Sequence, residues 1–97
     1  MQTRLICLET NEHIIINKPT FFIGRERAYV DHCILDATIS RVHCKLCYKD
    51  NGWYLTDCNS TNATYLNGNR VLPNAEFVLK DGDEIRLANI RFRHEEV

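Results

Sequence analysis

The fold of this chain is decided by residues 42–72, which read VHCKLCYKDNGWYLTDCNSTNATYLNGNRVL. This stretch holds two Asn-Gly pairs, Asn51-Gly52 and Asn67-Gly68, each flanked by short apolar runs. Asn-Gly between such runs is the strongest short-range signal for a β-hairpin, because both residues tolerate positive φ angles. The stretch therefore predicts two hairpins, with strands over residues 42–48, 53–56, 64–66 and 70–72.

Apolar runs of the same kind continue on both sides of this stretch, and turn residues separate them. The expected strands are 5–8, 14–16 and 21–23 before it, and 77–79, 84–87 and 90–93 after it. No window of eleven or more residues shows a sustained helical stripe. About eleven short strands separated by turns predict an all-β fold, an antiparallel β-sandwich. Two irregular stretches, 25–40 and 57–64, are expected as loops at its ends, where a rigid scaffold holds functional side chains.

Length and charge limit the function classes. The chain has 97 residues, enough for one domain over residues 1–97. Its formal net charge of -1 lacks the basic excess typical of nucleic-acid-binding domains. No apolar run approaches the roughly 20 residues that span a bilayer, and the first residues show no signal peptide. We therefore expect a cytoplasmic domain without a nucleic-acid partner and without membrane insertion.

The cysteines do not indicate catalysis. Their number, five, is odd, which argues against a closed set of disulfides and favours reduced thiols. Cys44 and Cys47 form a C-x-x-C motif within an expected strand, where residues three apart face opposite sides, so the two sulfurs diverge. His43 and Cys44 face opposite sides for the same reason and cannot pair as base and nucleophile. The sequence thus predicts no catalytic residue, no metal site and no cofactor; a thiol or zinc protein remains the distant alternative.

Three groups of polar residues lie in the expected loops: Gly24-Arg25, Ser40-Arg41-Val42-His43, and residues 57–68. They include two arginines, Arg25 and Arg41, and several hydroxyl and amide donors. A fixed guanidinium together with such donors is what a phosphate dianion needs. Ser, Thr and Asn also favour loops because they bond to their own backbone. Composition alone favours this second interpretation, so the residues leave both turn chemistry and anion binding open.

In their order and spacing, these groups resemble the forkhead-associated (FHA) domain family over about Leu5 to Phe92. The matching elements are Gly24-Arg25, Ser40-x-x-His43, Ser60-Thr61-Asn62-x-Thr64, Asn67-Gly68 and Asp81-Gly82-Asp83-x-Ile85. The resemblance implies an eleven-strand β-sandwich that binds phosphothreonine in partner proteins, or in its own chain, and is not an enzyme. It also implies a signalling role, and a domain of this kind is often part of a longer chain.

The resemblance also assigns roles to individual residues. Contacts with the phosphate or the peptide are implied for Arg25, Ser40, Arg41, Thr61 and Asn62. Structural support of the site is implied for Gly24, His43, Asn67 and Gly68, with His43 bracing the loops rather than touching the ligand. A guanidinium fork matches two phosphate oxygens, which a lysine cannot reproduce.

Ala63 is a departure from the family pattern, which has Gly at this position. If the position requires a positive φ angle, alanine costs of order 1 kcal/mol and reshapes the loop, which bears mainly on the orientation of Asn62. The alternative function is therefore a phospho-independent structural or dimerisation module that keeps the fold and has a degenerate site.

Overall fold

The computed structural model describes residues 2–97 and places almost all of them in short strands and turns. Its elements are β1 Thr3–Cys7, β2 His13–Ile16, β3 Thr20–Gly24, the 3-10 helix η1 Arg27–Tyr29, β4 His32–Cys33, β5 Cys44–Lys49, β6 Gly52–Asp57, β7 Thr64–Leu66, β8 Asn69–Arg70, β9 Glu76–Leu79, β10 Glu84–Leu87 and β11 Ile90–Glu96. Within residues 2–97, no helix has the length and apolar character needed to cross a membrane.

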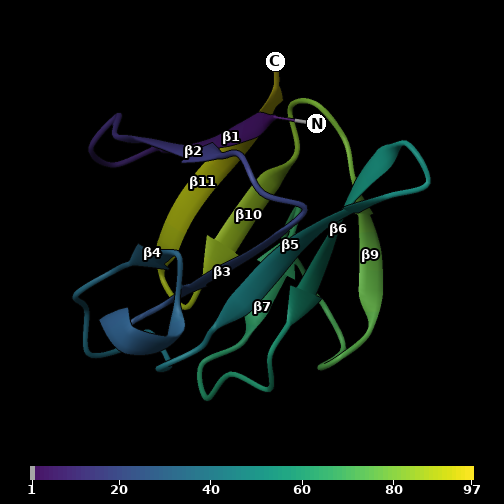
Figure 1. The fold of residues 1–97 in the computed structure, drawn as a ribbon. Helices are drawn as coiled ribbons and strands as arrows, with labels where there is room; N and C mark the ends of the chain where they lie inside the picture. The colour runs from purple at the N-terminus through teal and green to yellow at the C-terminus, as the bar shows by residue number, and fades with distance from the viewer. Residues whose placement is uncertain (1) are drawn as a thin grey trace.

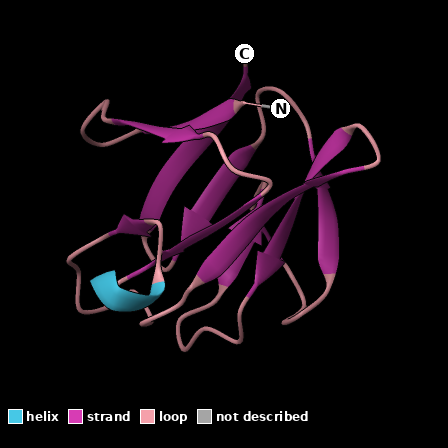
Figure 2. Cartoon of the chain, in the orientation of Figure 1, coloured by secondary structure: helices cyan, strands magenta, loops and turns pink. Residues whose placement is uncertain are grey.

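The strands form two sheets that face each other as a sandwich (Figure 1). One sheet has six strands in the order β2-β1-β11-β10-β7-β8, and the other has five in the order β4-β3-β5-β6-β9. The all-β sandwich predicted from the sequence is confirmed. All the strand pairs are antiparallel except β3 and β4, which run parallel. The sandwich is therefore mostly antiparallel, with one parallel pair that the sequence pattern did not indicate. The short helix η1 and strand β4 both lie in the stretch 25–40 that was expected as loop (Figure 2).

The first predicted hairpin turns between its expected strands 42–48 and 53–56. Lys49 pairs with Gly52, so the two-residue turn consists of Asp50 and Asn51, with φ angles of 51° and 62°. This register directs Trp53 into the core, where it packs against Tyr48. A shift by one residue would turn Trp53 to the outer face of the sheet. The second hairpin turns at Asn67-Gly68 as predicted.

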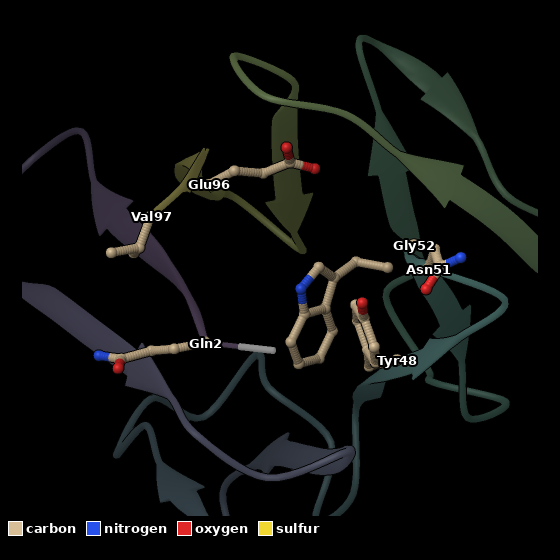
Figure 3. A pocket seen from close by; sticks show the side chains of 7 residues that line it. Gln2, Tyr48, Asn51, Gly52, Glu96 and Val97 are labelled. Carbon is tan, nitrogen blue, oxygen red and sulfur yellow. The ribbon is translucent and has the colours of Figure 1, made fainter.

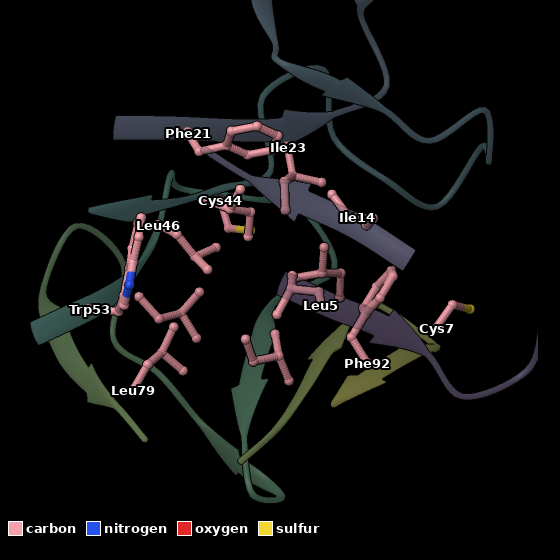
Figure 4. Close-up of a cluster of buried hydrophobic side chains, with 14 of the residues drawn as sticks. Leu5, Cys7, Ile14, Phe21, Ile23, Cys44, Leu46, Trp53, Leu79 and Phe92 are labelled. Atoms are coloured by element: carbon pink, nitrogen blue, oxygen red, sulfur yellow. The ribbon is translucent and has the colours of Figure 1, made fainter. Parts of the chain in front are cut away.

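The core lies between the two sheets and is built from alternate residues of the strands (Figure 4). Ile23, Leu46 and Leu55 come from the five-stranded sheet, and Leu5 and Ile85 come from the six-stranded sheet; all five are fully buried. Burial of a Leu or Ile side chain stabilises the fold by about 1.5–3 kcal/mol. The core therefore holds the sheets together as a rigid support for the loops at both ends.

The loops that carry Arg25, Ser40, Arg41, Thr61 and Asn62 gather at one end of the sandwich, whereas Asn67 and Gly68 lie in the turn at the other end of β7. Residues 25–43 connect β3, β4 and β5, and residues 58–63 connect β6 to β7. In Figure 1 these connections lie at the end opposite the two chain termini. The fold thus brings together the sequence groups around Arg25, Ser40 and Asn62, which are far apart in the chain.

Candidate functional site

Arg25 directly follows β3, and the neighbouring loop fixes its position. Its backbone N–H donates to the Ser40 carbonyl at 2.9 Å, and its side-chain Nε donates to the Ile39 carbonyl at 2.8 Å. The side chain is exposed, and within residues 2–97 its terminal guanidinium nitrogens make no hydrogen bond. The guanidinium is therefore anchored at Nε and keeps its outer N–H groups available for an anion.

Gly24 permits this arrangement because β3 passes very close to the backbone of Arg41. A Cβ atom added to Gly24 would collide with the Arg41 carbonyl oxygen and with Val42 Cα. The close approach lets the Arg41 carbonyl accept a hydrogen bond from Glu26 N–H at 3.1 Å. The exposed Arg41 side chain starts from this same segment. Gly24 thus allows close backbone packing directly before Arg25.

His43 joins the two site loops. The side chain is 0% exposed, its Nδ1 accepts a hydrogen bond from Ser40 N–H at 3.1 Å, and its Nε2 lies 3.0 Å from the Ala63 carbonyl oxygen. Since Nδ1 is an acceptor, Nε2 must carry the proton and donate to Ala63 in a neutral ring. Burial lowers the pKa of His43 below its ordinary value, which favours the neutral form.

Ser40 forms a second bridge between the same two loops. Its hydroxyl oxygen accepts a hydrogen bond from Thr61 N–H at 2.9 Å. The Ser40 hydroxyl proton remains free to donate, because that bond occupies only a lone pair. The side chain of Thr61 is exposed, and its hydroxyl has no partner among residues 2–97. The bond from Thr61 N–H to the Ser40 hydroxyl therefore brings these two residues together from adjoining loops.

The buried Asp57 carboxylate holds the 58–63 loop in place through hydrogen bonds, a role that was not predicted from the sequence. Its carboxylate is 1% exposed and accepts bonds from Ser60 N–H at 3.0 Å, from the Ser60 hydroxyl at 2.5 Å and from the Thr64 hydroxyl at 2.6 Å. An aspartate three residues before a serine is a local capping pattern, and this signal could have identified it. Ser60 is therefore turned inward, and Thr61 is the residue that faces outward.

Asn62 and Ala63 complete the loop. The Asn62 side-chain amide donates to the Thr38 carbonyl at 2.8 Å, so it reaches across to the loop that holds Ser40. Ala63 has a φ angle of 70°, so the position does require a left-handed backbone. The end of the loop is nevertheless fixed in position, because the Ala63 carbonyl accepts hydrogen bonds from His43 Nε2 and from Ala88 N–H at 3.1 Å. Residue 63 thus adopts the conformation that glycine favours, at a cost of order 1 kcal/mol.

Asn67 and Gly68 act at the opposite end of β7 from the site loops. They form the β7–β8 turn with φ angles of 51° and 83°. Asn67 Oδ1 accepts from Glu84 N–H at 2.9 Å, and its Nδ2 donates to Asp83 at 3.0 Å. These bonds hold β7 beside β10. Asn67 and Gly68 can therefore influence the 58–63 loop only indirectly, because β7 directly follows that loop.

The arrangement offers hydrogen-bond donors rather than a titrating pair. The donors without a partner among residues 2–97 are the outer N–H groups of Arg25, the guanidinium of Arg41 and the hydroxyl protons of Ser40 and Thr61. Arginine side chains and hydroxyl groups of this kind suit a ligand with several acceptor oxygens, such as a phosphate group. The site is thus equipped for anion binding.

The C-x-x-C residues lie apart from this site. Cys44 is fully buried in the core, and burial raises the pKa of its thiol well above the ordinary value. Cys47 lies on the other face of β5, with its sulfur 3.8 Å from the Thr20 hydroxyl. The two sulfurs diverge as the strand geometry predicts. All five cysteines are free thiols, and residues 2–97 contain no group of three or more potential metal ligands.

A separate hollow of about 190 Å³ lies near the chain termini (Figure 3). Gln2, Asn51 and Glu96 line it together with the packed Tyr48–Trp53 pair. No residue of the predicted site lines it. The residues predicted to contact the phosphopeptide lie instead at the other end of the sandwich, where Asn62 lines a cavity of about 230 Å³.

Comparison with known proteins gives consistent matches. The family model "FHA domain" matches residues 21–88. The serine/threonine-protein kinase RAD53 of Saccharomyces cerevisiae is 38% identical over 85 residues, an alignment covering 69% of this chain and 10% of that protein. The chain therefore spans about a tenth of the length of this curated relative.

Solved structures agree with this match. The MEK1 FHA domain in complex with the HOP1 pThr318 peptide superposes with a TM-score of 0.82 at 28% identity, covering 97% of this chain and 95% of that one. An FHA domain from Arabidopsis thaliana superposes with a TM-score of 0.90 at 27% identity, covering 99% and 86%. The family resemblance read from the sequence is thus confirmed, and the chain belongs to the FHA domain family.

Proposed function

We propose that this domain binds protein segments containing phosphothreonine through the loops around Arg25, Ser40 and Thr61. The observation that carries this proposal is the pair of bridges between the two loops, His43 to Ala63 and Ser40 to Thr61. These bridges leave the hydroxyl protons of Ser40 and Thr61 and the outer N–H groups of Arg25 without a partner among residues 2–97. A phosphothreonine brings a charge of about -1.5 to -2 and three acceptor oxygens to such a set of donors.

Each residue has a distinct role in the proposed complex. Arg25 pairs with two phosphate oxygens, and Ser40 and Thr61 donate their hydroxyl protons to the phosphate. Arg41 adds a second positive charge at the rim. Asn62 bonds the peptide backbone beside the phosphothreonine. Its amide nitrogen already contacts the Thr38 carbonyl, so the amide oxygen and one N–H remain available.

The comparisons support the same function. FHA domains are interaction modules, and the MEK1 FHA domain was solved with a phosphothreonine peptide. We infer that residues 1–97 form one binding module rather than a catalytic domain, with a phosphorylated protein segment as the partner, in trans or within a longer chain. The five free thiols favour a cytoplasmic location.

The test is calorimetric titration of one peptide in phosphothreonine, phosphoserine and unmodified threonine forms. We expect a dissociation constant of about 1 μM for the phosphothreonine form, or about -8 kcal/mol, and no measurable binding of the unmodified form. Arg25→Ala should weaken phosphopeptide binding at least about thirtyfold, because it removes a paired interfacial charge worth about 2–5 kcal/mol. Arg27→Ala, an exposed arginine two residues away in η1, is the matched control and should bind normally.

Two results would contradict the proposal. Equal affinity for phosphorylated and unmodified peptides would favour a phospho-independent interaction module. Unchanged phosphopeptide affinity in the Arg25→Ala variant would place the phosphate elsewhere on the domain.

A further inference from the structure

A row of cationic and aromatic side chains crosses the outer face of the six-stranded sheet. Strand register places Arg70 opposite Tyr65, Tyr65 opposite Arg86, and Arg86 opposite Arg91. These four residues come from β8, β7, β10 and β11, and we call them the arginine row. Each faces away from the core, because its strand neighbours, including Leu66 and Leu87, face inward. Strands β7, β10 and β11 of this face can be followed in Figure 1.

Arg86 is the best-oriented member of the arginine row. Its guanidinium carbon lies 3.7 Å from the centre of the Tyr65 ring, and its Nη1 donates to the Ala88 carbonyl at 2.8 Å. Stacking on an aromatic ring and one backbone bond fix the plane of the guanidinium. Within residues 2–97 no carboxylate pairs with Arg86, whereas Arg91 pairs with Glu9 at 3.1 Å. Four of the five Arg86 N–H donors therefore remain available.

A cavity joins Arg86 to the proposed phosphopeptide site. It measures about 230 Å³, and its lining consists of Thr38, Asn62, Tyr65, Arg86, Ala88 and Asn89. Asn62 is also the residue proposed to bond the peptide backbone. A direct hydrogen bond from Ala88 N–H to the Ala63 carbonyl keeps the β10–β11 turn against the site loop. A peptide held by Asn62 can therefore place a neighbouring side chain beside Arg86.

We propose that this cavity takes an acidic side chain of the same phosphorylated segment, which pairs with Arg86. The domain then selects phosphothreonines that have a carboxylate nearby in the sequence. This inference rests on the proposed function and deepens it. A guanidinium with a fixed plane and open N–H groups matches a carboxylate in a bidentate pair.

Charge on the rest of the face favours a peptide over a large polyanion. Glu84 and Glu95 lie on the same outer face as the arginine row, and Glu9 already neutralises Arg91. The chain as a whole has a net charge of -1. Nucleic acids and anionic membranes require broad basic surfaces, whereas one carboxylate needs only one open arginine.

The test uses phosphothreonine peptides in which one glutamate or one glutamine is placed at each neighbouring position on both sides. Wild type, Arg86→Gln and Arg93→Gln are titrated with each peptide. Arg86→Gln removes the charge and keeps a polar side chain on the same face of β10. Arg93 is the matched control because it lies on the same sheet face, pairs with Glu95 at 3.0 Å and does not line the cavity.

We expect glutamate at one or two positions to bind wild type about tenfold more tightly than glutamine. Arg86→Gln should remove this preference without weakening the glutamine peptides, and Arg93→Gln should retain it. Equal affinity for glutamate and glutamine peptides at every position, or a preference that survives in Arg86→Gln, would overturn the inference and leave phosphothreonine binding intact. Binding to phosphatidylserine-containing vesicles that depends on Arg86, without any glutamate preference, would also overturn it. Failure to bind any phosphothreonine peptide would instead remove the proposed function and this inference together.

Discussion

Replacing His43 with alanine tests whether one buried ring holds the two site loops together. The imidazole accepts from Ser40 N–H and donates to the Ala63 carbonyl, at 3.1 Å and 3.0 Å. The ring is 0% exposed, so no solvent competes for either bond in the folded protein. The substitution removes both bonds at once and leaves a cavity beneath the site.

The expected loss in the free energy of unfolding of His43→Ala follows from the bonds that the ring makes. A buried polar group left without its partner costs about 1–3 kcal/mol. Ser40 is only half-buried, and the Ala63 carbonyl keeps its bond from Ala88 N–H, so both losses fall at the low end of that range. With the lost packing of the ring, we expect a total of about 3 kcal/mol. For a domain of this size that corresponds to a fall of about 12–24 °C in Tm.

The assay is urea unfolding followed by the fluorescence of the buried Trp53, with His13→Ala as the matched control. His13 is exposed in β2, and its replacement should change the free energy of unfolding by no more than about 0.5 kcal/mol. Phosphopeptide affinity should also fall in His43→Ala under conditions where the variant is fully folded, because its loops are no longer preorganised. A destabilisation below about 1 kcal/mol, with unchanged affinity, would refute the bracing role of His43.

Three further predictions concern stability. Lowering the pH from 7.5 to 5.5 should lower the urea midpoint. Burial lowers the pKa of His43 and of His32 below the ordinary 6.5, so the unfolded state binds more protons than the folded state, and stability is lost as the pH falls from 6.5 through the folded-state pKa. A midpoint that rises over this interval would contradict this sign. Thr56→Val should raise the free energy of unfolding by about 1 kcal/mol in urea titrations, because the buried Thr56 hydroxyl has no partner within residues 2–97, and a loss of stability would reveal a bond that the structure lacks. Gly24→Ala should destabilise the domain by about 3 kcal/mol because the new Cβ meets the Arg41 backbone. The control Gly52→Ala should be nearly neutral, because its Cβ meets only the Tyr54 ring at 4.0 Å; equal melting temperatures for the two glycine variants would count against the close packing.

Much of the fold could be predicted because each strand carries its own apolar pattern and each turn its own residues. The alternation of Ile85 and Leu87 with Glu84 and Arg86 predicts a strand with one buried face, and the structure has it. Strand β4 could not be predicted, because two half-buried residues have no pattern and their parallel pairing depends on β3. The Asn51-Gly52 pair predicts the first hairpin, but it does not fix the two turn residues, because the register also depends on the burial of Trp53.

The residues of the candidate site lie in local sequence groups, and the resemblance to the FHA family, rather than their composition, indicated their roles. Arg25, Ser40 and Thr61 fall within such groups, and the structure brings their loops together. Asp57 was missed because its carboxylate works through bonds inside the protein rather than through exposure. Arg86 was missed because its place beside Asn62 depends on the pairing of β10 with β7, which no single segment of sequence contains.

The most direct test of the proposed site is a 1H–15N NMR titration with a phosphothreonine peptide and its unmodified form. We predict that the phosphorylated peptide shifts the backbone amide signals of Ser40, Arg41, Thr61 and Asn62 and the Nε–H signal of Arg25, and that the unmodified peptide does not. The amides of Asn51 and Gly52, at the hollow near the termini, should stay unchanged. Shifts concentrated at that hollow, or equal shifts with both peptides, would contradict the assignment of the site.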